Sequence, residues 1–556
     1  MFHSGITYGR IFPVVFAYSF FFSVSHEIEI KTKQGILDGF EMESRNGTTF
    51  YAFLGIPYAK PPVGNLRFQP PQPADSWEGV RDATEAPPAC IQRELVFAVD
   101  IALTGQEDCL YLNVFTPKDI KSPLPVMVWI HGGGFFEGEG SIYGPTYLLE
   151  NQIILVTINY RLGALGFLSA GDEVLPGNNG MKDQVAALKW VQEYIRDFGG
   201  DPQQVTIAGE SAGGSSVHFH MFSPLSKGLF QRAISQSGTA LALWARLTPA
   251  MARRRFVTFG ILAGCSPVPT QVLVDCLRKI PAEEIVLITQ KYYVWDLEPQ
   301  LIFTVVVEPE NATNAFLTQN PWSLNTPILH DVPWMIGMTS GEGVIKAARY
   351  LANGGKLVND LNENFKRYIP LILAYIYYLK PDDVEKTSEK LKSYYFKDQK
   401  LSLETEKGLA DLITDSYFLY DHIEAIDRHP SKPYVYLYDH KGEITVSDFT
   451  GDGKCCKSLG ASHADDLFNL FQLPVSPSNM LPEDLSVSER MIKYWINFIY
   501  TGKPTSDDSW KISKSPEIDY WHIETKSDSM KTGLQHDRYL FWKNLKAHPL
   551  DVFSKE

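Results

Sequence analysis

Runs of apolar residues recur along the chain, and most of them are too short to form a helix. Residues 126–130 (VMVWI) and 153–158 (IILVTI) are almost continuously apolar and rich in branched side chains. A short run of this kind is typical of a strand that is buried on both faces of a sheet. The runs at 205–208 (VTIA), 233–236 (AISQ) and 434–438 (YVYLY) predict further strands of the same kind.

Helical periodicity occurs between these runs. Apolar residues repeat at helical spacing and stop before Gly199-Gly200, a typical helix end, at positions Val185, Leu188, Val191, Ile195 and Phe198. Residues 212–222 can begin a second helix directly after the run at 205–208. Because strands alternate with helices, we expect an α/β fold with a mainly parallel central sheet and helices on both faces.

Composition is that of a globular protein. The chain has 556 residues, of which 44% are hydrophobic and 21% charged, so it has ample material for a core. No Pro/Gly/Ser-rich linker, long charge run or internal repeat divides it, and we expect one large domain over residues 26–556. The net charge of -14 argues against nucleic acid or an anionic membrane surface as a partner.

The N-terminus has the features of an export signal. Arg10 precedes the apolar run 11–24, and small residues at 23–25 offer a cleavage site before His26. The run is shorter than the roughly 20 residues that a membrane helix needs, once its polar residues are discounted. We therefore expect residues 1–25 to be a signal peptide and the protein to be secreted without a membrane span. An uncleaved anchor is the alternative.

Six cysteines fit an oxidising compartment. Two pairs can each close a local loop, which contributes about 3 kcal/mol in the chain-entropy model: Cys90 with Cys109, and Cys265 with Cys276. Cys455 and Cys456 fit neither pair, and the sequence leaves their state open. No CxxC or HxxxH spacing accompanies them, so we expect no metal site there.

Two N-x-[ST] acceptors are candidates for glycosylation in a secreted protein. They are Asn46, in Asn46-Gly47-Thr48, and Asn311, in Asn311-Ala312-Thr313.

Candidate chemistry begins at Ser211, which lies between Gly209 and Gly213. A lone G-x-S-x-G pattern is weak evidence, but this one joins a predicted strand to a predicted helix, as a nucleophile elbow requires. A glycine run at 132–134 follows the strand at 126–130, and its backbone N–H groups can point into a cavity as an oxyanion hole needs. No phosphate-binding G-K-[ST] or G-x-G-x-x-G follows. The two motifs together favour a serine hydrolase.

These motifs resemble those of a type-B carboxylesterase, a member of the carboxylesterase/cholinesterase family with the α/β-hydrolase fold. The resemblance runs from about residue 27 to about 545, is dense up to Trp244, and is thinner at 265–325 and 345–430. It is closest to insect-type secreted esterases. Four further stretches carry it: FLGIPYAKPPVGNLRF (53–68), EDCLYLNVFTP (107–117), NYRLGALGFLS (159–169) and the segment 177–202.

The resemblance implies a catalytic triad. Ser211 is the nucleophile, His463 in GASHADDLFNLF is the base, and Glu342 in IGMTSGEG is the acid that orients the imidazole. The N–H groups of Gly133, Gly134 and Ala212 form the oxyanion hole. No metal or cofactor is required for this chemistry.

The resemblance also implies roles around the triad. Glu210 and Ser237 support the triad, and Trp244 forms a wall of the acyl pocket, although a core tryptophan is an equal alternative. Further histidines (His218, His220, His440) are expected to be structural or exposed. Two structural ion pairs are implied, Arg67–Glu107 and Arg161–Asp183.

The expected substrates are small neutral esters. The cholinesterase branch places a tryptophan in the loop closed by the first disulfide, whereas residues 91–108 here contain Phe97 as their only aromatic side chain. We therefore expect neutral, lipophilic esters to be preferred over choline esters. The alternative from another class is a non-catalytic, cholinesterase-like adhesion protein. Such relatives lose the serine or the histidine and add a membrane span. The natural substrate and the oligomeric state stay open.

Overall fold

The computed structural model describes residues 28–94, 103–299, 302–453, 455–456, 458–513 and 517–553. The expected signal peptide (residues 1–25) and Phe97 lie outside the described residues.

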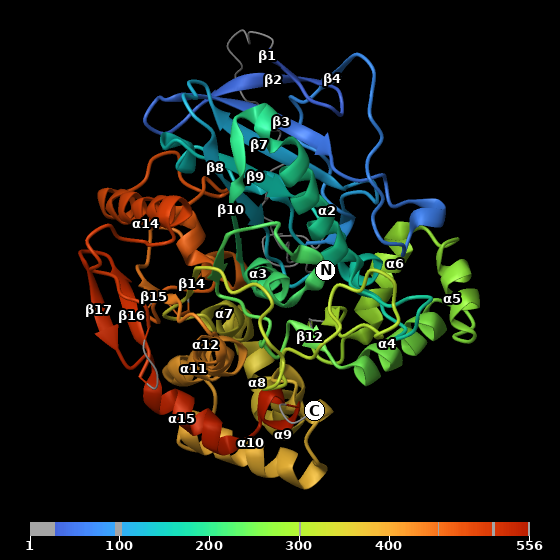
Figure 1. Cartoon of the computed structure of the whole chain (residues 1–556). Coiled ribbons are helices and arrows are strands. Elements are labelled where there is room, and N and C mark those ends of the chain that lie inside the picture. The colour runs from blue at the N-terminus through green and yellow to red at the C-terminus, as the bar shows by residue number, and fades with distance from the viewer. Residues whose placement is uncertain are drawn as a thin grey trace, which may run out of the picture.

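A large sheet organises the described part of the chain (Figure 1). Its thirteen strands follow the order β1-β2-β3-β7-β9-β8-β10-β11-β14-β15-β16-β17, with β4 paired to β2. From β9 to β16 every neighbouring pair is parallel, whereas β1, β2, β3, β7 and β17 join through antiparallel pairs. The expected α/β architecture with a mainly parallel central sheet is confirmed.

The strands have the following bounds. The large sheet contains β1 (Ile28–Lys31), β2 (Ile36–Glu43), β3 (Thr49–Pro57), β4 (Val80–Asp82), β7 (Tyr111–Pro117), β8 (Leu124–Ile130), β9 (Ile154–Ile158), β10 (Gly200–Glu210), β11 (Arg232–Gln236), β14 (Trp334–Thr339), β15 (Tyr434–Asp439), β16 (Asp519–Glu524) and β17 (Asp528–Thr532). Two small ribbons pair β5 (Gln92–Arg93) with β6 (Leu103–Thr104), and β12 (Arg246–Leu247) with β13 (Val305–Val306).

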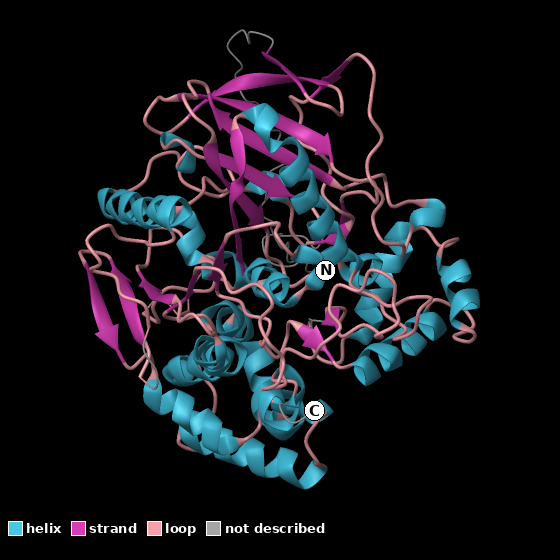
Figure 2. Ribbon diagram, viewed as in Figure 1, coloured by secondary structure: helices cyan, strands magenta, loops and turns pink. Residues whose placement is uncertain are grey.

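Helices cover both faces of the sheet (Figure 2). On β8, Val126 and Val128 pack into one apolar cluster while Met127 and Trp129 pack into another. The first cluster includes side chains of α2 (Asn179–Tyr194) and α3 (Ala212–Phe222), and the second includes those of α14 (Pro482–Thr501). Burial on both sides explains why these central strands are continuously apolar.

The remaining helices lie mainly in insertions between strands. Three follow β12, namely α4 (Pro249–Leu262), α5 (Thr270–Leu277) and α6 (Ala282–Ile288). Six lie between β14 and β15: α7 (Val344–Leu351), α8 (Lys356–Glu363), α9 (Phe365–Ile372), α10 (Pro381–Phe396), α11 (Glu406–Thr414) and α12 (Tyr420–Arg428). The others are α1 (Gly163–Phe167), α13 (Ser447–Thr450), α15 (His536–Leu545) and α16 (Pro549–Phe553).

Disulfides and ion pairs join these elements. The structure joins Cys90 to Cys109, Cys265 to Cys276 and Cys455 to Cys456, and no described cysteine is free. Both implied ion pairs are confirmed, with Arg67 Nη2 at 2.5 Å from Glu107 Oε2 and Arg161 Nη2 at 2.7 Å from Asp183 Oδ1. Asn46 and Asn311 are exposed. Among the described helices, none combines the length and apolar composition needed to cross a bilayer.

Candidate active site

Ser211 lies on a tight turn between β10 and α3. Its backbone adopts φ 56° and ψ -119°, an uncommon conformation for a residue with a side chain. The turn brings α3 so close to β8 that a Cβ on Gly213 would lie 2.0 Å from the carbonyl oxygen of Ile130. Only glycine fits at that position, so the G-x-S-x-G pattern has a steric cause. Backbone strain of this kind is common at functional sites.

The turn is held by Gln236 at the end of β11. Its carbonyl oxygen accepts a hydrogen bond from the Ser211 N–H at 2.8 Å, and its side-chain amide donates to Asp466 at 2.8 Å. Gln236 therefore connects the serine turn to the loop that carries His463. Neither Gln236 nor Asp466 was predicted from the sequence, although Asp466 lies three residues after His463 in the segment GASHADDLFNLF.

Glu342 and His463 meet at the same edge of the sheet. Glu342 follows β14 and is fully buried, and its Oε2 accepts a hydrogen bond from His463 Nδ1 at 2.5 Å. Its other oxygen accepts from Ser237 Oγ at 2.6 Å and from the Thr339 N–H at 2.8 Å. Three donors fix this carboxylate, and the carboxylate in turn fixes the orientation of the imidazole.

His463 lies between two carboxylates. Its Nε2 is 3.1 Å from Oε1 of Glu210, the residue immediately before Ser211. Burial alone would lower the pKa of His463, but the charges of Glu210 and Glu342 and the hydrogen bond to Glu342 raise it to about 9. Burial opposes the ionised form of Glu342 as well, but His463, Ser237 and Thr339 leave its pKa below the ordinary value.

The pKa of Glu210 is raised, unlike that of Glu342. Burial raises it to about 8, against the attraction of His463 and with a further contribution from Asp466 and Glu342. Since Glu210 Oε1 and His463 Nε2 lie 3.1 Å apart, the protonation of each group depends on the charge of the other.

The glycine run lies against the serine. A Cβ on Gly132 would approach the Ser211 Cβ to 3.1 Å, so the backbone of this loop lies directly beside the predicted nucleophile. Gly133 and Gly134 both have positive φ, at 92° and 59°. Ala212 is the first residue of α3, so its N–H has no acceptor within the helix.

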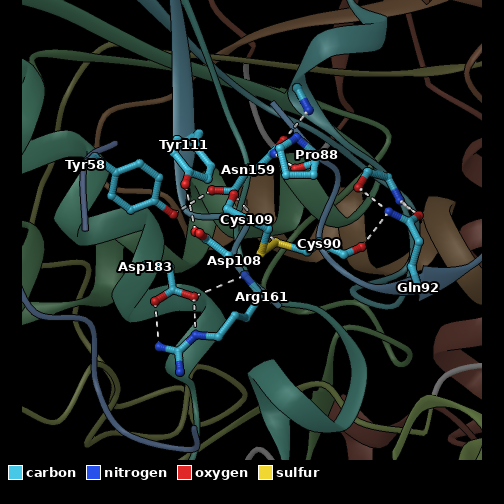
Figure 3. The surroundings of a disulfide bond; sticks show 12 residues. Tyr58, Pro88, Cys90, Gln92, Asp108, Cys109, Tyr111, Asn159, Arg161 and Asp183 are labelled. Atoms are coloured by element: carbon cyan, nitrogen blue, oxygen red, sulfur yellow. Dashed lines mark hydrogen bonds and ion pairs between the residues drawn. A yellow bond between two sulfur atoms is a disulfide. The ribbon is translucent and has the colours of Figure 1, made fainter. Parts of the chain in front are cut away.

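The segment around the first disulfide contacts the end of this loop through side-chain hydrogen bonds; Figure 3 shows the disulfide with Gln92 and Asn159. Beyond Cys90, the side chain of Gln92 donates to the Gly138 carbonyl at 3.0 Å and accepts from the Gly138 N–H at 2.6 Å. Asn159 accepts from the Gly140 N–H at 2.8 Å and donates to the Pro88 carbonyl at 3.1 Å. The end of the glycine-rich segment is thus fixed by side chains from two other segments.

One aromatic side chain packs against His463, and a second packs against the first. The ring of Phe418 lies 4.7 Å from the imidazole, and Trp244 lies 6.1 Å from Phe418. Trp244 Nε1 donates to the Tyr417 carbonyl at 2.8 Å. Both Tyr417 and Phe418 belong to a π-helical turn, Asp415–Leu419, and such turns are frequent at functional sites. Phe418 was not identified from the sequence, since it lies where the family resemblance is thin.

Two other buried histidines, His440 and His220, lie in separate networks. His440 Nε2 is 2.7 Å from Asp484, and its Nδ1 is 2.9 Å from Thr525 Oγ1. His220 bonds through its two nitrogens to Ser226 and Gln184. These contacts do not involve Ser211 or Glu342.

Known proteins are similar to this chain in sequence and in fold. The family model described as "Carboxylesterase family" matches residues 26–542. "Esterase FE4" of Myzus persicae is 40% identical over 512 residues, which cover 89% of this chain and 88% of that protein. "Juvenile hormone esterase" of Tribolium castaneum is 38% identical over 502 residues, covering 87% and 85%.

A solved structure agrees with these relatives. The juvenile hormone esterase from Manduca sexta, crystallised with OTFP covalently attached, superposes with a TM-score of 0.83 at 29% identity. The match covers 94% of this chain and 99% of that one. The chain therefore belongs to the carboxylesterase family and is a carboxylic ester hydrolase.

Proposed function

We propose that the protein is a secreted serine carboxylesterase that hydrolyses neutral, lipophilic esters through Ser211, Glu342 and His463. The observation that carries this proposal is the pairing of His463 with a fully buried Glu342 beside the serine turn. The glycine run against Ser211 supports it.

The reaction proceeds by two acyl transfers. Neutral His463 accepts the proton of the Ser211 hydroxyl, whose oxygen attacks the ester carbonyl. The N–H groups of Gly133, Gly134 and Ala212 bind the developing oxyanion, each contributing on the order of 3 kcal/mol. His463 then returns the proton to the leaving alcohol, and water hydrolyses the acyl-enzyme by the reverse sequence of proton transfers.

Apolar surroundings support the proposed substrate class. Phe418 packs beside the imidazole and Trp244 packs against Phe418, and we infer that the acyl group of an ester lies near these rings. The sequence of the first disulfide loop lacks the tryptophan that binds choline, and a desolvated cation–π contact contributes about 2 kcal/mol. We expect kcat/KM for naphthyl acetate to exceed that for acetylthiocholine by about 30-fold. The reverse preference would contradict the substrate class while leaving the esterase activity intact.

Two relatives are named juvenile hormone esterase, which makes a hormone ester one candidate substrate. Esterases specific for that hormone often carry glutamine before the nucleophile, whereas this chain carries Glu210, and this difference favours a broader ester specificity. A non-catalytic adhesion role is disfavoured because the serine, the glutamate and the histidine are all retained.

Ser211→Ala tests the nucleophile. The variant should lose ester hydrolysis while unfolding at the same urea concentration as the wild type, since the hydroxyl adds little to packing. Ser215→Ala is a matched control, because Ser215 is fully buried on the same helix. A phosphorylating inhibitor should add mass to the peptide containing Ser211 alone. An active Ser211→Ala protein would contradict the proposal.

The proposed export is tested separately. The full chain expressed in insect cells should accumulate in the medium with an N-terminus near His26. It should carry glycans at Asn46 and Asn311 that a glycosidase removes. Retention in the membrane fraction with an intact N-terminus would support the uncleaved anchor instead.

A further inference from the structure

Cys455 and Cys456 form a pair that does not cross-link the fold. The two residues are adjacent, so a bond between them encloses no chain segment. In the chain-entropy model the stabilisation by a disulfide increases with the length of the loop that it closes. This pair therefore contributes almost nothing by that route, unlike Cys90–Cys109 and Cys265–Cys276. Its two sulfur atoms are available for another role.

A carboxylate from another element lies beside the pair. The Cys456 N–H donates to Glu406 Oε2 at 3.1 Å. A carboxylate oxygen of Glu406 and the two cysteine sulfurs all lie within 4.8 Å of one another. Glu406 begins α11, whereas the cysteines lie in the loop before His463, so sequence spacing could not reveal the group. No other group of three such side chains meets this distance among the residues that the structure describes.

The group of Cys455, Cys456 and Glu406 is partly exposed. Cys455 and Glu406 are partly exposed, whereas Cys456 is buried. The Cys455 sulfur is also 3.9 Å from the Ala348 carbonyl on α7. The group thus lies among α7, α11 and the loop that leads to His463.

We propose that Cys455, Cys456 and Glu406 form a redox-gated binding site for one soft divalent cation. The oxidised pair cannot bind the ion, because both sulfurs are engaged in the disulfide. A small thiol opens it by two exchanges. The first thiolate attacks one sulfur, forms a mixed disulfide and releases the other cysteine. A second thiol attacks the mixed disulfide, which frees the remaining cysteine and leaves the small thiol as its own disulfide.

The reduced group has ligands that suit zinc. Two thiols lose their protons and bind as thiolates, and the Glu406 carboxylate supplies an oxygen. Zinc–sulfur bonds of about 2.3 Å in a tetrahedral site separate two sulfurs by about 3.8 Å. The two sulfurs move apart once the disulfide is reduced, and the Glu406 oxygen already lies within 4.8 Å of both. A water molecule can complete the coordination.

Zinc stoichiometry tests the proposal. The enzyme is reduced with a small monothiol, desalted without oxygen and titrated with zinc chloride by calorimetry and native mass spectrometry. We expect one zinc per reduced chain and none per oxidised chain. Glu406→Gln should weaken binding at least about tenfold, because one of three protein ligands is lost. Bound zinc should also raise the Tm of the reduced wild type, since it links three elements of the fold.

The double variant Cys455→Ser/Cys456→Ser is the matched control. It keeps the other two disulfides, so zinc that binds to thiols released from them appears equally in both proteins. Ester hydrolysis at the wild-type rate verifies that the variants are folded. Equal zinc binding by the wild type and the double variant would overturn the site. Zinc binding by the oxidised wild type would overturn the redox gating, and undiminished binding by Glu406→Gln would overturn the carboxylate ligand.

Discussion

Replacing Glu210 by glutamine should shift the pH dependence of ester hydrolysis. The change keeps the size of the side chain and removes its negative charge, 3.1 Å from Nε2 of His463. Only neutral His463 can accept the serine proton, so kcat/KM falls as the pH drops below the pKa of the imidazole. Because Glu210 and Glu342 raise that pKa to about 9, the acid limb of the wild type should lie well above about 6.5, the ordinary histidine value.

The size of the pKa shift expected for His463 follows from the short distance between its Nε2 and the Glu210 carboxylate. Two unit charges 3.1 Å apart attract by about 5 kcal/mol at an effective dielectric constant of about 20. Glu210 carries only part of its charge near neutral pH, since burial raises its own pKa to about 8. An opposite charge at this range typically moves a pKa by about 1 to 3 units, and we expect the acid limb of Glu210→Gln to move down by about 2.

The limiting value of kcat/KM at alkaline pH should be lower in Glu210→Gln than in the wild type. An imidazole with a lower pKa is a weaker base and removes the serine proton less readily. If the proton is about half transferred in the transition state, a pKa lower by about 2 reduces this limiting kcat/KM about tenfold. The variant should then be about tenfold faster than the wild type on the acid side, where more of its imidazole is neutral. The two pH profiles should therefore cross.

The assay measures kcat/KM for a naphthyl ester between acid and alkaline pH, within the range where both proteins stay folded. Asp484→Asn is the matched control, because Asp484 is a carboxylate in a comparable contact, 2.7 Å from Nε2 of His440. Its profile should coincide with that of the wild type. If the acid limbs of Glu210→Gln and the wild type also coincided, the carboxylate would not control the protonation of His463, and the reasoning would be refuted.

Three further changes test other parts of the structure. His463→Ala should lower kcat by several decades while His440→Ala retains activity, measured at saturating ester, and the opposite result would identify His440 as the base. Gly134→Asp places a carboxylate beside the proposed oxyanion site and should reduce ester turnover at least tenfold, whereas unchanged turnover would exclude Gly134 from that site. Lys182→Met leaves the buried carboxylate of Glu308 without the ion-pair partner that lies 2.6 Å away, so urea unfolding should show a loss of about 3 to 5 kcal/mol. A loss below about 1 kcal/mol would mean that Glu308 is neutral or has found another donor.

The central strands could be predicted because burial on both faces leaves a strong local pattern. The five apolar runs correspond to β8, β9, β10, β11 and β15, which all lie in the parallel part of the sheet. The outer strands are different. β17 (DSMKT) is at the edge of the sheet and is half-buried or exposed along its length, so its sequence shows no apolar run. An edge strand owes its structure to pairing with a neighbour, which the sequence pattern does not record.

Some residues of the site could likewise be predicted from local sequence, and others could not. Ser211 and the glycine run stand in local motifs, because close backbone approach requires glycine at fixed positions. The pairing of Glu342 with His463 has no such local signal, and only the family resemblance related the two. Gln236 and Phe418 act through contacts with segments far away in the sequence, which a reading of neighbouring residues cannot detect.

The protonation of His463 is harder to predict from the sequence than the positions of the site residues. The resemblance implies that Glu210 supports the triad, but it does not say that this carboxylate faces the nitrogen that must accept the serine proton. In that position Glu210 stabilises the charged imidazole, which favours the transition state, and it also holds the proton that the resting base must lose. The same contact therefore assists the reaction at alkaline pH and limits it at acid pH. Since burial of Glu210 weakens its charge, the depth of this one side chain sets the balance between the two effects.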